Sequence, residues 1–285
     1  MRNPVSRMRT ATSAVSGTAV ASVARALRVL KAFADHPGGI ALTRLSAELG
    51  YGKASLSKIM STLEREGFVR RDGAGHFHLT WRLLALAFGH AQRVGISGVC
   101  MPVLQSLADE TDELVQLAVI EGDHVLFVAK AEGPGHSLRL LPLVGVVAPT
   151  HATASGKVWL ASLPDDRALD VMRRQGLARV TSRARLLAEL RSVRRDGYAI
   201  TDGELDEGGR AIAAPIVHRG RVVGAIAVSG PSSRLPLPRL KRLAPRVQRA
   251  ARELEALWPH EVTARDFGLG VRPPNGDGRP ARRNA

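Results

Sequence analysis

The chain is poor in cysteine, in aromatic residues and in long apolar stretches. Of its 285 residues one is cysteine, Cys100, and 4% are aromatic. A single cysteine makes neither an intramolecular disulfide nor a cysteine zinc cluster, which excludes redox and structural zinc roles. The longest apolar run, residues 140–148, is far shorter than the roughly 18 residues that a spanning helix needs. With no secretory apolar stretch near the N-terminus, we expect a cytoplasmic protein without a membrane span.

Acidic residues are scarce relative to basic ones. The chain has 41 Lys and Arg against 26 Asp and Glu, a formal net charge of +15. Because each phosphate neutralised by Lys or Arg releases condensed counterions, this excess favours a polyanionic partner such as nucleic acid or an anionic membrane. A basic surface that only keeps the chain in solution is the alternative. The 45% hydrophobic content is enough for a real core, and the length suggests two domains.

The periodicity of apolar residues divides the chain into segments. Residues 1–20 and 259–285 show neither helical nor strand periodicity and are expected to be disordered basic tails. Between them we expect a small first domain at 21–80, a linker helix at 81–97 and a larger second domain at 98–258.

Three helices are expected in the first domain. Ser22 can accept the free N–H groups of a helix that ends near residues 36–39. A short second helix begins near Thr43 and ends at Gly50, a natural left-handed stop. The third helix has one apolar stripe at the spacing i, i+3, i+4 and i+7, formed by Leu56, Ile59, Met60 and Leu63.

The opposite face of the third helix is polar, and a hairpin follows it, with strands at 68–71 and 76–79 around the turn 72–75. This order predicts a winged helix-turn-helix, whose third helix enters the major groove of DNA while the wing lies over the backbone. Small hydroxyl residues let such a helix approach base edges, and Lys and Arg reach phosphates or guanine. An ordinary helical hairpin on a small sheet is the alternative. The candidate DNA-binding residues are Arg44, Lys53, Ala54, Ser55, Ser57, Lys58, Ser61, Thr62, Arg70, Arg71 and His76.

The second domain is expected to be a GAF/PAS-like α+β fold, with a small-ligand pocket where the sheet meets its helices. Alternation of apolar residues indicates strands at 114–120, 124–130, 137–144, 210–218 and 221–229. Helical spacing indicates helices at 99–111, 154–162, 165–174 and 238–258, and one more that is capped by Thr181 and ends at 196–197.

Sequence patterns that carry catalysis are incomplete. Gly156 and Lys157 lack the glycine that a phosphate loop needs at position 151, which is His151, and Ser155 lies two residues before Lys157 instead of three. The acidic stretch 202–207 lacks the last carboxylate of a calcium loop, so we expect a solvated turn or a lid over a pocket there. The sequence therefore predicts no enzyme, no cofactor, and neither catalytic nor metal-binding residues.

Four segments, in this order and spacing, resemble the IclR-type bacterial transcription regulators over about residues 20–258. They are SVARAL at 22–27, LEREGFV at 63–69, HATASGK at 151–157, and a set of GYA at 197–199, AAP at 213–215 and SGP at 229–231. The resemblance implies a winged domain that binds operator DNA as a homodimer, often assembled into a homotetramer. It also implies a C-terminal domain that binds a small organic-acid effector, in a regulator that represses or activates catabolic genes.

The resemblance also implies which residues form the two sites, although several of them differ from the residues usual in the family. The family usually has a Ser-Thr pair and an Arg where this chain has Ala54, Ser55 and Lys58, and Lys lacks the planar fork of Arg. Ala211 and Ala227 are apolar where polar groups commonly anchor a carboxylate, so a small anion would be poorly solvated. We therefore expect an effector larger or less polar than a short keto acid, such as an aromatic acid. The implied effector-binding residues are Ala154, Ser155, Gly156, Thr201, Asp202, Ala211, Ala227 and Ser229.

Two other functions fit the same sequence. A small-molecule-binding enzyme with a helical oligomerisation arm would tolerate Lys58→Glu and would not retain DNA. A protein that coats DNA without sequence preference would bind less tightly as salt rises and would protect no preferred site. For the regulator, an effector that favours one dimer arrangement changes the spacing of the recognition helices. Its operators should be near-palindromic, with half-sites separated by about one helical turn or a multiple.

Overall fold

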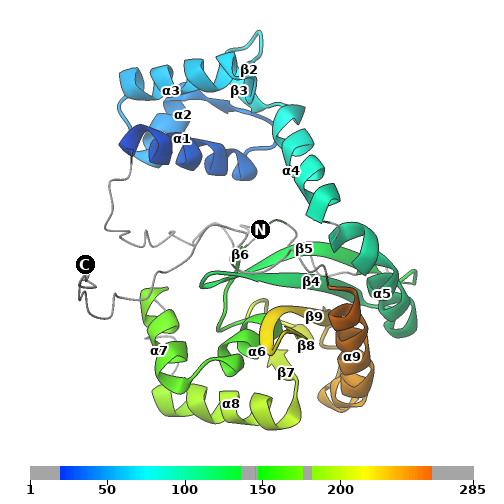
Figure 1. The fold of residues 1–285 in the computed structure, drawn as a ribbon. Helices are drawn as coiled ribbons and strands as arrows, with labels where there is room; N and C mark the ends of the chain where they lie inside the picture. Colours follow the sequence, from blue (N-terminus) through cyan, green and yellow to red (C-terminus); the bar gives the residue numbers. More distant parts are fainter. Residues whose placement is uncertain (1–19, 95, 136–144, 146, 176–181, 259–285) are drawn as a thin grey trace, which may run out of the picture. The chain divides into compact units, whose positions relative to one another are not determined.

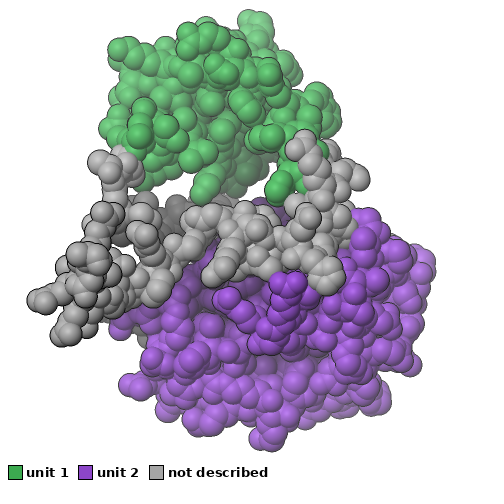
Figure 2. All heavy atoms as spheres, in the orientation of Figure 1, with its two compact units in different colours: residues 1–93 green, residues 94–285 purple. Residues whose placement is uncertain are grey.

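In a computed structural model of the chain, the described residues are 20–94, 96–135, 145, 147–175 and 182–258 (Figure 1). The chain divides into two compact units, residues 1–93 and 94–285 (Figure 2). The expected strand at 137–144, the expected cap Thr181 and the tail segments 1–19 and 259–285 lie outside the described residues. Among the described helices none is long and apolar enough to cross a membrane.

The first unit is held together by the apolar stripes of three helices. In α3 (Lys53–Arg65) the stripe predicted from the sequence is buried, with Ile59 only partly so. It packs against α1 (Ala21–Ala32) and α2 (Leu42–Leu49). The expected Ser22 cap is wrong, because α1 begins directly after Val20 and Ser22 lies inside its first turn. Gly50 ends α2 in the left-handed conformation, as expected.

A hairpin and two further helical segments complete this unit. β2 (Val69–Arg71) and β3 (His76–Leu79) pair antiparallel around the turn that the sequence predicted. The sequence did not reveal β1 (Ile40–Ala41), which pairs with β3 and gives the sheet order β1-β3-β2. A 3₁₀ turn, η2 (Phe33–Asp35), follows α1, and α4 (Trp81–Val94) follows β3. The unit therefore has the order of a winged helix-turn-helix.

The second unit is built on one six-stranded antiparallel sheet with the strand order β6-β5-β4-β9-β8-β7. Four of these strands match the predicted ones, whereas β6 and β7 were not predicted. Each of those two has four residues or fewer, too few for a clear alternation. The strands are β4 (Leu114–Glu121), β5 (His124–Glu132), β6 (Val147–Ala148), β7 (Ala199–Asp202), β8 (Gly209–His218) and β9 (Arg221–Pro231).

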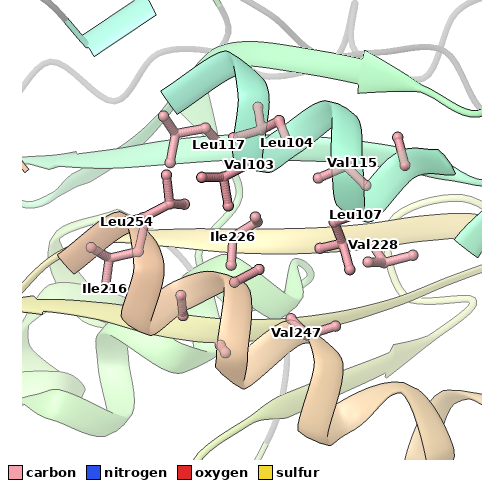
Figure 3. Close-up of a cluster of buried hydrophobic side chains, with 14 of the residues drawn as sticks. Val103, Leu104, Leu107, Val115, Leu117, Ile216, Ile226, Val228, Val247 and Leu254 are labelled. Carbon is pink, nitrogen blue, oxygen red and sulfur yellow. The ribbon is translucent and has the colours of Figure 1, made fainter. Parts of the chain in front are cut away.

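Helices cover both faces of this sheet, and each face has its own apolar cluster. On one face α5 (Ile96–Thr111) and α9 (Leu237–Leu257) pack on alternate strand residues; Figure 3 shows Leu104, Leu117, Ile226 and Leu254 meeting there. On the other face lie α6 (Ala154–Ser162), α7 (Asp165–Arg174) and α8 (Arg183–Asp196). This arrangement is the α+β architecture expected from the sequence.

The ends of the helices on the second face depend on local capping. Thr153 precedes α6, and its hydroxyl accepts a hydrogen bond from the Gly156 N–H. Ser182, the neighbour of the expected cap, accepts from the Arg185 N–H at the start of α8. Gly197 ends α8 with a positive φ of 73°, a conformation that glycine adopts without strain.

Candidate functional site

The polar face of α3 is open to solvent. Because Leu56, Met60 and Leu63 turn inward, the residues between them must turn outward. Ser55 is half-buried, and the Thr62 hydroxyl donates to the Lys58 carbonyl at 2.9 Å. The predicted residues that are exposed on this helix are Lys53, Ala54, Ser57, Lys58, Ser61 and Thr62.

The remaining predicted DNA-binding residues lie on α2 and on the wing. Arg44 is exposed but pairs with Glu48, with 3.1 Å between Nε and Oε1. Arg70 and His76 are exposed on β2 and β3. The Arg71 guanidinium lies 5.5 Å from the centre of the Phe77 ring, which restrains its orientation. Exposed cations on two adjacent elements can contact the phosphates on both sides of a groove.

The second unit contains a cavity between the start of α6 and the sheet, opposite the face shown in Figure 3. Its volume is about 50 Å³. Both apolar and polar side chains line it. Six of the eight residues implied by the resemblance do so: Ala154, Ser155, Thr201, Ala211, Ala227 and Ser229.

Gly156 and Asp202 lie outside the lining. The Gly156 N–H bonds to Thr153, and a Cβ at this glycine would overlap the backbone of Thr150, so Gly156 permits close packing behind the cavity. Asp202 instead accepts two hydrogen bonds from Arg210, at 2.6 and 3.1 Å. The family resemblance predicted both residues as effector-binding, but it does not show in which direction their side chains point.

Strand register explains how distant residues meet on the cavity floor. Thr201 lies opposite Ala211, and Ala211 lies opposite Ser229, so β7, β8 and β9 contribute one row. In the next row Ala227 lies opposite Gln116 of β4. Because cross-strand partners share a face of the sheet, these side chains all point toward α6. Small residues in both rows leave space above the sheet.

Further lining residues were missed by the sequence analysis. Gln116 could have been found, because it is the polar residue within the apolar run 114–120 and is 6% exposed. The others carried no such signal, since Phe127 is an apolar residue within an apolar strand and the rest come from loops or strand ends. The missed residues are Gln116, Phe127, Ala152, Thr153, Leu205, Asp206, Gly209 and Arg210.

The start of α6 supplies the cavity with hydrogen-bond donors. The first N–H groups of a helix have no partner within it, and its N-terminus carries a partial positive charge. Thr153 satisfies the N–H groups of Gly156 and Lys157, whereas those of Ala154 and Ser155 have no partner among the described residues and can donate to an acceptor in the cavity. The Arg210 guanidinium, by contrast, is already engaged by Asp202 and by the carbonyls of Ser232 and Leu235.

Three buried polar atoms of the lining have no hydrogen-bond partner among the described residues: Gln116 Nε2, Ser155 Oγ and Ser229 Oγ. Such groups are normally satisfied, and leaving one unpaired costs about 1–3 kcal/mol. Their convergence on one cavity from β4, α6 and β9 marks it as a place for a ligand with several polar atoms.

Lys157 connects the cavity to the segment after β7. Its side chain is 2% exposed, and its ammonium donates to Glu189 of α8 and, at 2.6 Å, to Glu204. Glu204 lies between two glycines with positive φ, Gly203 and Gly208, and its neighbours Leu205 and Asp206 line the cavity. The acidic stretch thus lies beside the cavity, as the sequence suggested for a lid. Burial lowers the pKa of nearby His151, and the negative charge of Glu204 offsets part of this shift.

Sequence comparison assigns both units. Residues 22–73 match the IclR helix-turn-helix domain, and residues 88–256 match the family described as bacterial transcriptional regulator IclR, C-terminal. The transcriptional repressor IclR of Escherichia coli is 30% identical over 243 residues, which cover 82% of this chain and 89% of the repressor. The chain belongs to the IclR family of DNA-binding transcriptional regulators.

Solved structures of IclR-family proteins have the same fold. An IclR transcriptional regulator from Alicyclobacillus acidocaldarius superposes with a TM-score of 0.73 and 27% identity, over 84% of this chain and 99% of that one. An IclR homologue from Microbacterium hydrocarbonoxydans, solved as a complex with 4-hydroxybenzoate, has a TM-score of 0.68 and 25% identity, over 82% and 98% of the two chains. The family and fold expected from the sequence are therefore confirmed.

Proposed function

We propose that this IclR-family protein binds specific operator sequences through α3 and the wing, and that a small organic acid in the cavity of the second unit controls this binding. The observation that carries the proposal is the exposed polar face of α3, where Ser57, Lys58 and Ser61 lie opposite the stripe that buries Leu56, Met60 and Leu63. A helix with this division can enter a major groove without disturbing its own core.

In this proposal the chain has three working parts. Residues 21–80 are the DNA-binding domain, 81–97 a linker helix, and 98–258 the effector-binding domain. The hydroxyls of α3 contact base edges, and Lys53, Lys58, Arg70 and Arg71 contact phosphates or guanine. The chain acts in the cytoplasm, where bacterial DNA lies, and is neither an enzyme nor dependent on a cofactor.

Footprinting on the DNA that flanks the gene tests DNA recognition. We expect protection of a near-palindrome with half-sites about one helical turn apart, or a multiple. Lys58→Ala and Ser57→Ala should each abolish the protected site at the concentration where the unmodified protein protects it. Lys241→Ala changes an exposed lysine of α9 and is the matched control, which should leave protection intact. Binding without any preferred site would overturn the proposal in favour of a DNA-coating protein.

The effector is proposed to be a carboxylic acid larger than a short keto acid, with one aromatic ring. The free N–H groups at the start of α6 suit a carboxylate, and the Ala211 and Ala227 floor suits an apolar ring. The complex of the related Microbacterium protein with 4-hydroxybenzoate supports this class. Calorimetry decides: tight glyoxylate or pyruvate binding without binding of aromatic acids would end the idea.

A homodimer or homotetramer is proposed as the active form. Two copies place two recognition helices on one face of the duplex, which is how a palindrome is read. An effector that prefers one arrangement of the copies then alters the spacing of those helices.

A further inference from the structure

Gln116 is a buried polar side chain in an otherwise apolar strand. Its neighbours in β4 are Val115 and Leu117, both fully buried in the cluster on the opposite face. Gln116 itself is 6% exposed, and its amide nitrogen has no partner among the described residues. A buried amide N–H without a partner destabilises the folded chain, so a purely structural role does not account for it.

The position of Gln116 in the sheet places its amide at one side of the cavity. α6 packs mainly on β8 and β9, and its first residues, Ala154 and Ser155, line the cavity together with Ala211 and Ala227 of those two strands. Gln116 projects from β4, the next strand beyond β9, and its cross-strand neighbour there is Ala227. The Ala227 methyl group is too small to fill the space between the amide and α6.

The surroundings of the amide favour a flat ligand. Ala211 and Ala227 form an apolar floor, while Phe127 and Leu205 add apolar walls. A ring that lies on this floor with its carboxylate under α6 presents its other substituents along the sheet, toward β4. An oxygen at that point would complete the hydrogen bonding of the Gln116 amide.

We propose that Gln116 is a specificity-determining residue, whose amide donates a hydrogen bond to a hydroxyl or carbonyl oxygen that the effector carries away from its carboxylate. The ligand class is thus an oxygen-substituted aromatic acid and not an unsubstituted one. The inference rests on the proposed effector role of the cavity, and it adds a residue and a second polar group to that role.

The test uses the full-length protein and three probes: benzoate, 3-hydroxybenzoate and 4-hydroxybenzoate. By calorimetry the unmodified protein should bind at least one hydroxybenzoate about tenfold more tightly than benzoate, the worth of one buried hydrogen bond. Gln116→Leu keeps the size of the side chain but removes the donor, and should bring the ratio close to one. Gln105→Leu, on the outer side of α5, is the control and should keep the preference.

A second readout separates specificity from structure. Gln116→Leu removes an unpaired buried amide, so its thermal midpoint should equal or exceed that of the unmodified protein. A clear loss of stability would show that the amide holds the fold and would overturn the inference. Equal affinity for all three probes, or binding of none at millimolar concentration, would overturn it too. If these results overturn the role of Gln116 but the DNA footprint is present, the proposed regulator function still holds. If the ligand preference is present but no footprint is found, only the proposed regulator function is contradicted.

Discussion

Asp72 organises the turn of the wing through a single carboxylate. It accepts hydrogen bonds from the backbone N–H groups of Ala74 and His76, at 3.0 and 2.8 Å, and its second oxygen lies 2.7 Å from His78 Nε2. The hydrogen bond with His78, followed by that with the His76 N–H, lowers the pKa of Asp72 from 3.8 to about 2. The charged carboxylate is therefore part of the wing.

Strong acid should weaken the wing by protonating Asp72. Because the pKa of Asp72 is lower in the folded hairpin than in the unfolded chain, its contribution is complete above the ordinary value of 3.8 and disappears as the pH falls toward 2. An NMR titration should give a carboxyl midpoint near 2, and Asp72→Asn should remove this part of the pH dependence. A midpoint near 3.8 would contradict the hydrogen-bonded turn.

Lys157 allows a test of a buried charge cluster. Its ammonium is almost inaccessible to water and is compensated by Glu189 and Glu204. Either carboxylate alone can neutralise it, so Glu189→Gln and Glu204→Gln should each cost little. The double variant leaves a buried unpaired charge and should lose about 3 kcal/mol of unfolding free energy.

Urea unfolding of the four proteins in this cycle measures the coupling between the two carboxylates. The control is Glu253→Gln on α9, which removes an exposed ion pair with Arg249. It should change the free energy of unfolding by less than about 0.5 kcal/mol. If the double variant loses only the small sum of the two single stability losses, Lys157 is not a buried charge that depends on these two carboxylates.

Among the elements, helices were predictable and the shortest strands were not. The stripe of α3 and the limits of α6 follow from local spacing, because each helix buries one face of its own sequence. The two residues of β1 gain their identity only by pairing with β3, more than 30 positions later in the chain. The Ser22 cap failed because the capping position is Val20, two residues before the serine.

We expect the copies of the proposed homodimer to meet at exposed apolar side chains on α1 and α4. Trp81 is 82% exposed, and Val23 and Leu27 are each more than half exposed. Burial of such side chains in a homodimer is favourable, and tryptophan commonly dominates interfaces. Trp81→Glu should therefore weaken self-association at least about 30-fold in sedimentation equilibrium.

The control for that experiment is Val217→Glu, an exposed apolar residue of β8 in the second unit. It should sediment like the unmodified protein. If the unmodified chain is monomeric at micromolar concentration, or if Trp81→Glu sediments like the control, these side chains do not form the dimer interface.

At the scale of the whole molecule, the cavity shows what sequence reasoning reaches. The resemblance named Ser155 and Ser229, which lie more than 70 positions apart, and the structure brings them together. The sequence shows Gln116 as a polar residue in an apolar run, but not its place beside the cavity, because the register of β4 against β9 is a property of the assembled sheet. Nor could it show that Asp202 turns to Arg210, since that depends on the partner that each side chain meets.

Operator recognition by the polar face of α3 is tested most directly by comparing affinities for the protected palindrome and a scrambled duplex across a range of salt. Arg70→Ala, on the wing, should weaken binding to both duplexes alike and lower the salt slope by about one. Ser57→Ala/Lys58→Ala should reduce the preference for the palindrome by tenfold or more, which is roughly the worth of one base contact. An unchanged preference in that double variant would contradict the central claim, because the exposed face of α3 would then not read DNA.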